Sequence, residues 1–454
     1  MAIQSQNPAT GEILKKFDPY SDEQVEDALA QSMAAFKILR KWAFEKRAEH
    51  MRNVAQILRD EVDQLAKIAT LEMGKTYAAA KAEILKSAVT VDYYADTAAQ
   101  YLADDIVDIG AKKSYRKYLP LGPVLAVMPW NFPIWQVIRF AAPAVMAGNS
   151  CLLKHASNVP QCALYIEDIF RRAAFPEGAF QTLLIGGSKV ERILRDDRVR
   201  AATLTGSEPA GASVASICGQ EIKPTILELG GSDAFIIMPS ADIEKAVQIG
   251  TIARTQNNGQ SCIAAKRFFI HADIYDDVKA RLKASFEALK VGDPMDTTTD
   301  IGPIVNEESR TEIIAQVKNA LDDGASCVTG AEAVEGDGFF FTPGILENIP
   351  ESSKAYHEEI FGPVALLFKV DTLDEAIEIA NSSPFGLGSA IFTQDEAEQE
   401  KAISDIEAGA TFVNSMTSSS PHLPFGGVKR SGYGRELAAE GIRAFCNIKA
   451  VNIA

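Results

Sequence analysis

Short apolar runs alternate with helical segments through the middle of the chain, and this alternation constrains the fold more than any other feature. The run at 123–128 is followed by a proline-rich turn, a helical pattern to Met146, a break at Gly148 and a second run at 151–153. A β-α-β unit occupies about thirty residues in this way. Similar runs recur at 181–185, 201–204, 225–229 and 234–237. We therefore expect an α/β fold with a mostly parallel sheet.

The length of the chain favours more than one lobe, because its 454 residues exceed the ~250–300 at which single hydrophobic cores usually stop growing. Apolar positions recur three and four apart over 21–73 and 75–101, which predicts outer amphipathic helices. The apolar run at 445–454 predicts a terminal strand.

The charge balance of the chain argues against several classes of partner. A net charge of −16 repels phosphate backbones and anionic membranes, and no segment approaches the ~20 apolar residues of a membrane span. We expect no nucleic-acid or membrane partner and a cytoplasmic location. The six cysteines lack CxxC spacing, so neither a disulfide framework nor a metal site is expected.

Cys262 differs from the other cysteines in its surroundings. It ends the stretch Asn257-Asn-Gly-Gln-Ser-Cys262, whose glycine and small polar residues let backbone amides approach a molecule that the sulfur attacks. Free cysteines are more often buried and inert, and the other five lie in apolar or helical settings. Cys262 is therefore the candidate nucleophile.

Glu228 interrupts the apolar run 225–229 just before Gly230 and Gly231, so it is expected at the end of a parallel strand, where α/β sites form. Partial burial there raises a carboxyl pKa towards that of a general base, although a structural ion pair is an equal alternative. Thr205-Gly206-Ser207 follows another strand and opens a helix, which suits an anion site or a simple helix cap. No GxGxxG motif follows a strand, so the ordinary Rossmann mode of binding is not supported.

Six short motifs follow one another along the chain: Pro129-Trp-Asn-Phe-Pro133, Leu204-Thr-Gly-Ser207, Leu227-Glu-Leu-Gly-Gly231, Gly259-Gln-Ser-Cys262, Glu358-Glu-Ile-Phe-Gly-Pro-Val364 and Pro424-Phe-Gly-Gly427. Together they resemble the aldehyde dehydrogenase superfamily. The resemblance implies a Rossmann-like cofactor-binding domain (1–103 and 122–228), a catalytic α/β domain (229–430) and a small β oligomerisation element (104–121 and 431–454). It also implies a homodimer or homotetramer.

The resemblance assigns roles to individual residues. Cys262 is similar to the nucleophile that forms a thiohemiacetal, Asn131 to the side chain of the oxyanion hole, and Glu228 to the base that activates water against the thioester. It implies cofactor contacts from Met128, Pro129, Trp130, Lys154, Ser157, Thr205, Gly206, Ser207, Leu229, Glu359 and Phe361.

The choice of cofactor depends on one departure from the family pattern. The family commonly reads Lys-Pro-Ser-Glu where this chain reads Lys154-His-Ala-Ser157. A glutamate at the last position repels a 2′-phosphate, whereas Ser157 removes that charge and can donate a hydrogen bond. This favours NADP over NAD; a pocket that accepts both is the alternative.

Trp135 and Arg139 lie four apart on the helix after Asn131 and so share one face. An arginine there suggests a substrate carboxylate, shared with Ser419 of the 418–420 loop, and the pattern is similar to the succinate-semialdehyde dehydrogenase branch. An arginine bonded to a carbonyl or an acid is the alternative. Gln256 also lies where some of those enzymes have a second arginine. Competing functions are a dehydrogenase of other aldehydes, a CoA-acylating dehydrogenase and a non-catalytic relative.

Overall fold

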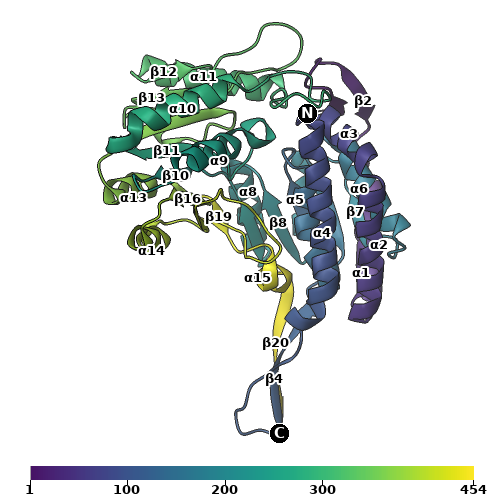
Figure 1. The fold of residues 1–454 in the computed structure, drawn as a ribbon. Helices are drawn as coiled ribbons and strands as arrows, with labels where there is room; N and C mark the ends of the chain where they lie inside the picture. The colour runs from purple at the N-terminus through teal and green to yellow at the C-terminus, as the bar shows by residue number, and fades with distance from the viewer. Residues whose placement is uncertain (1) are drawn as a thin grey trace.

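The computed structural model describes residues 2–454 and confirms the α/β fold expected from the sequence. Two large sheets, each covered by helices on both faces, make up most of the molecule, and a narrow ribbon of strands projects from one end (Figure 1). Among the described residues, no helix is long and apolar enough to cross a membrane.

The first large sheet has the strand order β19-β9-β8-β5-β6-β7, and only β19 runs antiparallel to its neighbour. Its strands are β5 (Val124–Met128), β6 (Cys151–His155), β7 (Phe180–Thr182), β8 (Ala201–Thr205), β9 (Thr225–Glu228) and β19 (Gly432–Tyr433). The connecting helices are α5 (Trp135–Ala147), α6 (Pro160–Arg172), α7 (Val190–Arg195) and α8 (Glu208–Gln220). The β-α-β pattern of the sequence is thus confirmed.

Four outer helices precede this sheet, as the amphipathic pattern predicts. They are α1 (Asp22–Leu39), α2 (Phe44–Asp60), α3 (Val62–Met73) and α4 (Tyr77–Tyr101). Gly74, at φ 86°, ends α3, and the hydroxyl of Thr76 caps the start of α4. From α4, Glu83 reaches α5, where its Oε1 accepts the backbone amides of Ile134 and Trp135, both at 2.8 Å. This carboxylate satisfies donors at the start of α5 and fixes the helix after the Asn131 turn.

The second large sheet has the order β12-β13-β14-β11-β10-β16-β17, with β12 antiparallel at one edge. Its strands are β10 (Asp233–Ile237), β11 (Ala265–His271), β12 (Ser326–Thr329), β13 (Gly344–Glu347), β14 (Val364–Val370), β16 (Ser389–Phe392) and β17 (Thr411–Val413). The helices of this half are α9 (Ile243–Thr255), α10 (Tyr275–Glu287), α11 (Glu307–Asp322), α12 (Lys354–His357), α13 (Leu373–Asn381) and α14 (Glu396–Asp405).

The projecting ribbon is formed by β3 (Asp105–Ile106), β4 (Lys113–Pro120) and β20 (Cys446–Ile453) in the order β20-β4-β3. The C-terminus lies at its tip, and α15 (Ala438–Arg443) leads into it (Figure 1). The predicted terminal strand is therefore confirmed. The domain boundaries stay a prediction. β19 lies within 431–454, the segment assigned to the oligomerisation element, but it pairs with β9 of the first sheet. Two small antiparallel pairs complete the strands: β1 (Ile3–Gln6) with β2 (Ile13–Phe17), and β15 (Phe385–Gly386) with β18 (Val428–Lys429).

Candidate active site

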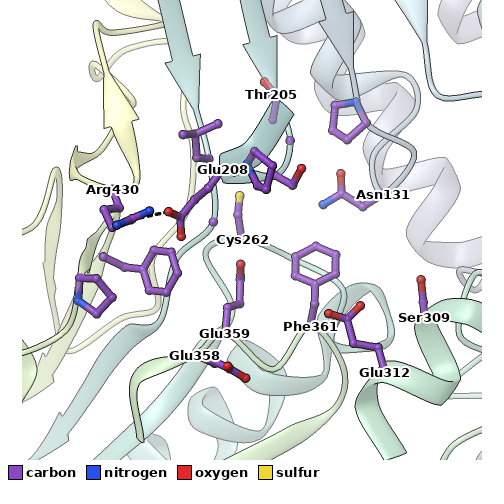
Figure 2. Close-up of a pocket in the computed structure, with 18 of the residues that line it drawn as sticks. Asn131, Thr205, Glu208, Cys262, Ser309, Glu312, Glu358, Glu359, Phe361 and Arg430 are labelled. Carbon is purple, nitrogen blue, oxygen red and sulfur yellow. Dashed lines mark hydrogen bonds and ion pairs between the residues drawn. The ribbon is translucent and has the colours of Figure 1, made fainter. Parts of the chain in front are cut away.

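Cys262 lies in a tight turn between α9 and β11 and lines a pocket of about 830 Å³ (Figure 2). Asn257, Asn258 and Gly259 before it take left-handed φ values of 57°, 58° and 75°. A side chain at Gly259 would come within 2.4 Å of the backbone nitrogen of Pro363, so only glycine fits there. The polar, glycine-bearing approach noted in the sequence is therefore a constrained turn that presents the sulfur to the pocket.

The thiol of Cys262 is partly exposed, but its surroundings disfavour the thiolate. Burial raises its pKa to about 12; the charges of Lys266 and Arg139 oppose this shift, and those of Glu359 and Glu228 add to it. The buried Lys266 ammonium donates to the carbonyls of Ser261 (2.8 Å) and Cys262 (2.6 Å) and is ion-paired with Glu359 at 2.8 Å. Cys262 is thus held firmly, but it needs a base or an added positive charge to ionise at neutral pH.

Glu228 ends β9 and is 2% exposed. Within residues 2–454, neither of its carboxylate oxygens has a hydrogen-bond partner. Burial raises the pKa of Glu228 well above its ordinary value; Arg139 and Arg435 oppose this shift, and Glu436 adds to it. The structural ion pair considered from sequence is not formed, and an unbonded carboxyl of raised pKa suits a general base.

Asn131 lies in the turn between β5 and α5, 4% exposed, and reaches the same pocket as Cys262 (Figure 2). Its Nδ2 donates to the carbonyl of Gln260 at 3.1 Å, and the Nδ2 of Asn257 donates to the carbonyl of Asn131 at 2.8 Å. These bonds tie the Asn131 turn to the Cys262 turn. A carboxamide carries two N–H hydrogens, so one is left for an oxyanion.

The start of α8 forms another wall of the pocket. Ser207 is its N-cap but makes no capping bond through its side chain, so backbone amides of the first turn are open to a ligand. A side chain at Gly211 would come within 2.6 Å of Leu229, so glycine lets α8 pack closely there. Open amides beside a large pocket fit the pyrophosphate of a dinucleotide.

Most of the expected cofactor residues meet around this pocket, but not all. Trp130 and Phe361 pack edge to face at 5.8 Å. Also lining it are Pro129, Asn131, Thr205, Gly206, Ser207, Leu229 and Glu359. Met128, Lys154 and Ser157 do not line it: Met128 is buried at the end of β5, and burial lowers the pKa of Lys154 at the end of β6. No local sequence signal points to Arg430 and Glu208, which form an ion pair and line the pocket (Figure 2).

Trp135 and Arg139, the two substrate residues expected on α5, are both buried but contact different partners. Trp135 is 4% exposed, and its ring lies 4.2 Å from the Nζ of Lys86. Arg139 is 2% exposed, ion-paired with Glu436, and donates to the Oγ1 of Thr205 at 3.3 Å. The sequence predicted that Arg139 is free to bind a substrate carboxylate. In the structure its guanidinium is instead ion-paired with the buried carboxylate of Glu436. Ser419 instead accepts a hydrogen bond from Lys86 at 2.8 Å.

Residues 1–451 match the model of the aldehyde dehydrogenase family. The chain belongs to this family. The resemblance stated from six motifs is thereby confirmed, together with the class of enzyme. Aldehyde dehydrogenases are oxidoreductases, whereas the roles expected of Cys262, Asn131 and Glu228 stay predictions.

Individual relatives of known name extend over the whole chain. The protein named succinate-semialdehyde dehydrogenase (NADP+) 1 of Mycobacterium ulcerans is 57% identical over 455 residues, 99% of each chain. The protein of that name from Mycobacterium tuberculosis is 56% identical over 457 residues, 100% of each chain. The crystal structure of succinic semialdehyde dehydrogenase from Streptococcus pyogenes in complex with NADP+ superposes with a TM-score of 0.98 at 39% identity and covers 100% of both chains.

Proposed function

We propose that this protein oxidises succinate semialdehyde to succinate with NADP+ as the preferred cofactor, and that NAD+ is a poorer alternative. The observation that carries the proposal is full-length identity of 56–57% to enzymes named for this reaction. The arrangement of Cys262, Asn131 and Glu228 supports it chemically. A dehydrogenase of broader aldehyde range is the second candidate, because the buried Arg139–Glu436 pair removes the arginine expected to select an acid.

In the proposed mechanism, Cys262 attacks the aldehyde carbon as a thiolate and forms a thiohemiacetal. Asn131 Nδ2 and the backbone N–H of Cys262 donate to the oxyanion, a type of contact that contributes about 3–4 kcal/mol to lowering a barrier. A bound nicotinamide would accept the hydride that leaves the thiohemiacetal carbon, and loss of this hydride leaves a thioester on Cys262. Glu228 then takes a proton from the water that attacks the thioester, which releases the acid and restores Cys262.

The preference for NADP+ rests on Ser157, which follows the end of β6 and is partly exposed. A hydroxyl at this position can donate to a 2′-phosphate, whereas a carboxylate would repel it. Lys154 lies on β6, three residues before Ser157, and its positive charge can attract the same phosphate.

We also propose that the protein is a cytoplasmic homodimer or homotetramer. β20 is the edge strand of the projecting ribbon, and most of its residues are exposed, including Ile448 at 57%. An unprotected edge of this length favours pairing with another copy of the chain.

The decisive experiment compares kcat/KM for succinate semialdehyde and butanal, each with NADP+ and NAD+, on the wild type and on Cys262→Ala. We expect a strong preference for the semialdehyde with NADP+ and no activity in the variant. Equal rates with butanal would leave a general aldehyde dehydrogenase. Activity in Cys262→Ala would overturn the mechanism.

A further inference from the structure

The turn between α3 and α4, residues 74–76, contacts the turn that presents Cys262. Asn258, four residues before Cys262, is 2% exposed and has a left-handed φ of 58°. Its Nδ2 donates to the carbonyl of Gly74 at 2.9 Å and to that of Pro303 at 3.0 Å. Both amide hydrogens of Asn258 thus hold the Cys262 turn against neighbouring segments.

Lys75, the next residue of the α3–α4 turn, reaches the Asn131 turn through Glu83. Its ammonium is ion-paired with Glu83 of α4, and the two side chains are 0% and 3% exposed. The Oε1 of Glu83 accepts the backbone amides of Ile134 and Trp135, the third and fourth residues after Asn131. The ion pair therefore holds the backbone that carries the expected oxyanion donor.

Four residues make these contacts without lining the pocket. We call them the α3–α4 brace: Gly74, Lys75, Glu83 and Asn258. None of them is among the residues of 2–454 that line the pocket of Cys262. Burial lowers the pKa of Lys75 and the charge of Glu83 opposes this shift, so the ammonium depends on Glu83 to stay charged. The brace does not reach the pocket, and its effect on the reaction has to pass through the two turns.

The spacing between Asn131 and Cys262 is the quantity that these contacts affect. The oxyanion develops on the carbon that the sulfur attacks, and a donor acts on it from about 2.7–3.1 Å. Asn131 follows β5 of the first sheet, whereas Cys262 precedes β11 of the second sheet. Their relative position therefore depends on contacts between the two halves of the molecule, and the brace makes such contacts from one short segment of chain.

We infer that the α3–α4 brace positions Asn131 against Cys262, with Glu83 as a positioning residue for the oxyanion donor. This inference rests on the proposed function, in which Asn131 donates to the oxyanion. Without Glu83, the amides of Ile134 and Trp135 lose their acceptor, so the start of α5 and the turn before it can shift. A misplacement of about 1 Å can slow a reaction roughly 100-fold.

The test compares two neutral forms of the ion pair. Lys75→Met/Glu83→Gln removes both charges but keeps a carbonyl oxygen for the two amides, whereas Lys75→Met/Glu83→Met also removes that acceptor. The rate of NADPH formation is measured in a single turnover, with enzyme in excess over succinate semialdehyde. We expect a loss of roughly 10- to 100-fold in the second variant, recovery of most of the rate in the first, and an unchanged Kd for NADP+ in both. Arg59→Met/Asp92→Met removes a partly exposed ion pair of α4 and should match the wild type.

A second comparison shows whether the loss passes through Asn131. In an Asn131→Ala background, Lys75→Met/Glu83→Met should slow the reaction much less, because no side-chain donor is left to misplace. An equal loss in both backgrounds, or a wild-type rate without the acceptor, would overturn the brace. If Asn131→Ala itself keeps the wild-type rate, the proposed role of Asn131 fails instead.

The other arm of the brace provides a variant that leaves the buried ion pair intact. Asn258→Gly keeps a residue that adopts the left-handed backbone and removes the bond to Gly74. It should also slow the single turnover, and less so in the Asn131→Ala background. It carries the test if Lys75→Met/Glu83→Met does not fold, and a wild-type rate in Asn258→Gly would then overturn the brace.

Discussion

The guanidinium of Arg139 is ion-paired with the carboxylate of Glu436, and both side chains are at most 3% exposed. The pair lies near the carboxyl of Glu228, because Arg139 lowers the pKa of Glu228 and Glu436 raises it. Arg139 is therefore bonded inside the protein, and its charge opposes the rise in the pKa of Glu228.

Replacement of Arg139 by Met should impair both succinate semialdehyde and butanal to a similar extent, because the change leaves Glu436 buried without a partner. Loss of one member of a buried pair costs about 3–5 kcal/mol. The free energy of unfolding measured in urea should therefore be lower in the variant by an amount of that order. Glu436→Gln, which keeps an acceptor for the guanidinium, should cost less. If Arg139→Met loses activity with succinate semialdehyde but keeps it with butanal, Arg139 contacts the substrate carboxylate directly, as expected from the sequence.

Glu228→Gln should lower kcat by roughly 10²- to 10⁴-fold, the usual range for loss of a general base, because the thioester is no longer hydrolysed efficiently. The first turnover should survive as a burst of NADPH in stopped-flow measurements. Since the pKa of Glu228 is raised by burial, its basic form is gained as pH rises, and wild-type kcat should increase with pH. The kcat of Glu228→Gln should lack this dependence; steady turnover at the wild-type rate would remove Glu228 from the mechanism.

The fold, the turn that presents Cys262 and the strand-end position of Glu228 could be predicted from the sequence because their signals are local. The turn at Asn257–Gly259 precedes Cys262 directly, and Glu228 stands at the end of an apolar run. The partners of Arg139 and Lys86 could not be predicted in this way, because they lie far away along the chain. Lys86 and Ser419 are separated by 333 residues along the chain, and only the packing of α4 against α5 and the late loops brings them together.

Ser157→Glu should reverse the cofactor preference, because the introduced carboxylate repels a 2′-phosphate and can accept from the ribose hydroxyls of NAD+. We expect kcat/KM with NADP+ to fall by about 100-fold, as for loss of a charged hydrogen bond together with added repulsion, and the value with NAD+ to stay level or rise. Ser157→Ala is the control that removes the hydroxyl alone. Equal effects on both cofactors in Ser157→Glu would show that Ser157 does not face the 2′ position.

His155, the last residue of β6, connects this strand to the turn that contains Asn131. Its Nε2 lies 2.9 Å from the carbonyl oxygen of Pro133, and its Nδ1 lies 3.3 Å from the carbonyl oxygen of Met128 and 2.9 Å from the amide nitrogen of Ala156. Burial lowers the pKa of His155 from 6.5 to about 4, so the folded protein keeps this ring neutral at physiological pH.

This lowered pKa makes the stability of the protein depend on pH. As pH falls below 6.5, the unfolded chain takes up the proton before the folded protein does, so the free energy of unfolding should decline until about pH 4. A shift of this size corresponds to roughly 3 kcal/mol. His155→Gln cannot titrate, so the difference in unfolding free energy between wild type and variant should narrow by that amount between pH 7 and pH 4, as measured by urea denaturation. Parallel pH profiles for the two proteins would show that His155 accepts a proton in the folded state as readily as in the unfolded chain, and that burial does not hold the ring neutral.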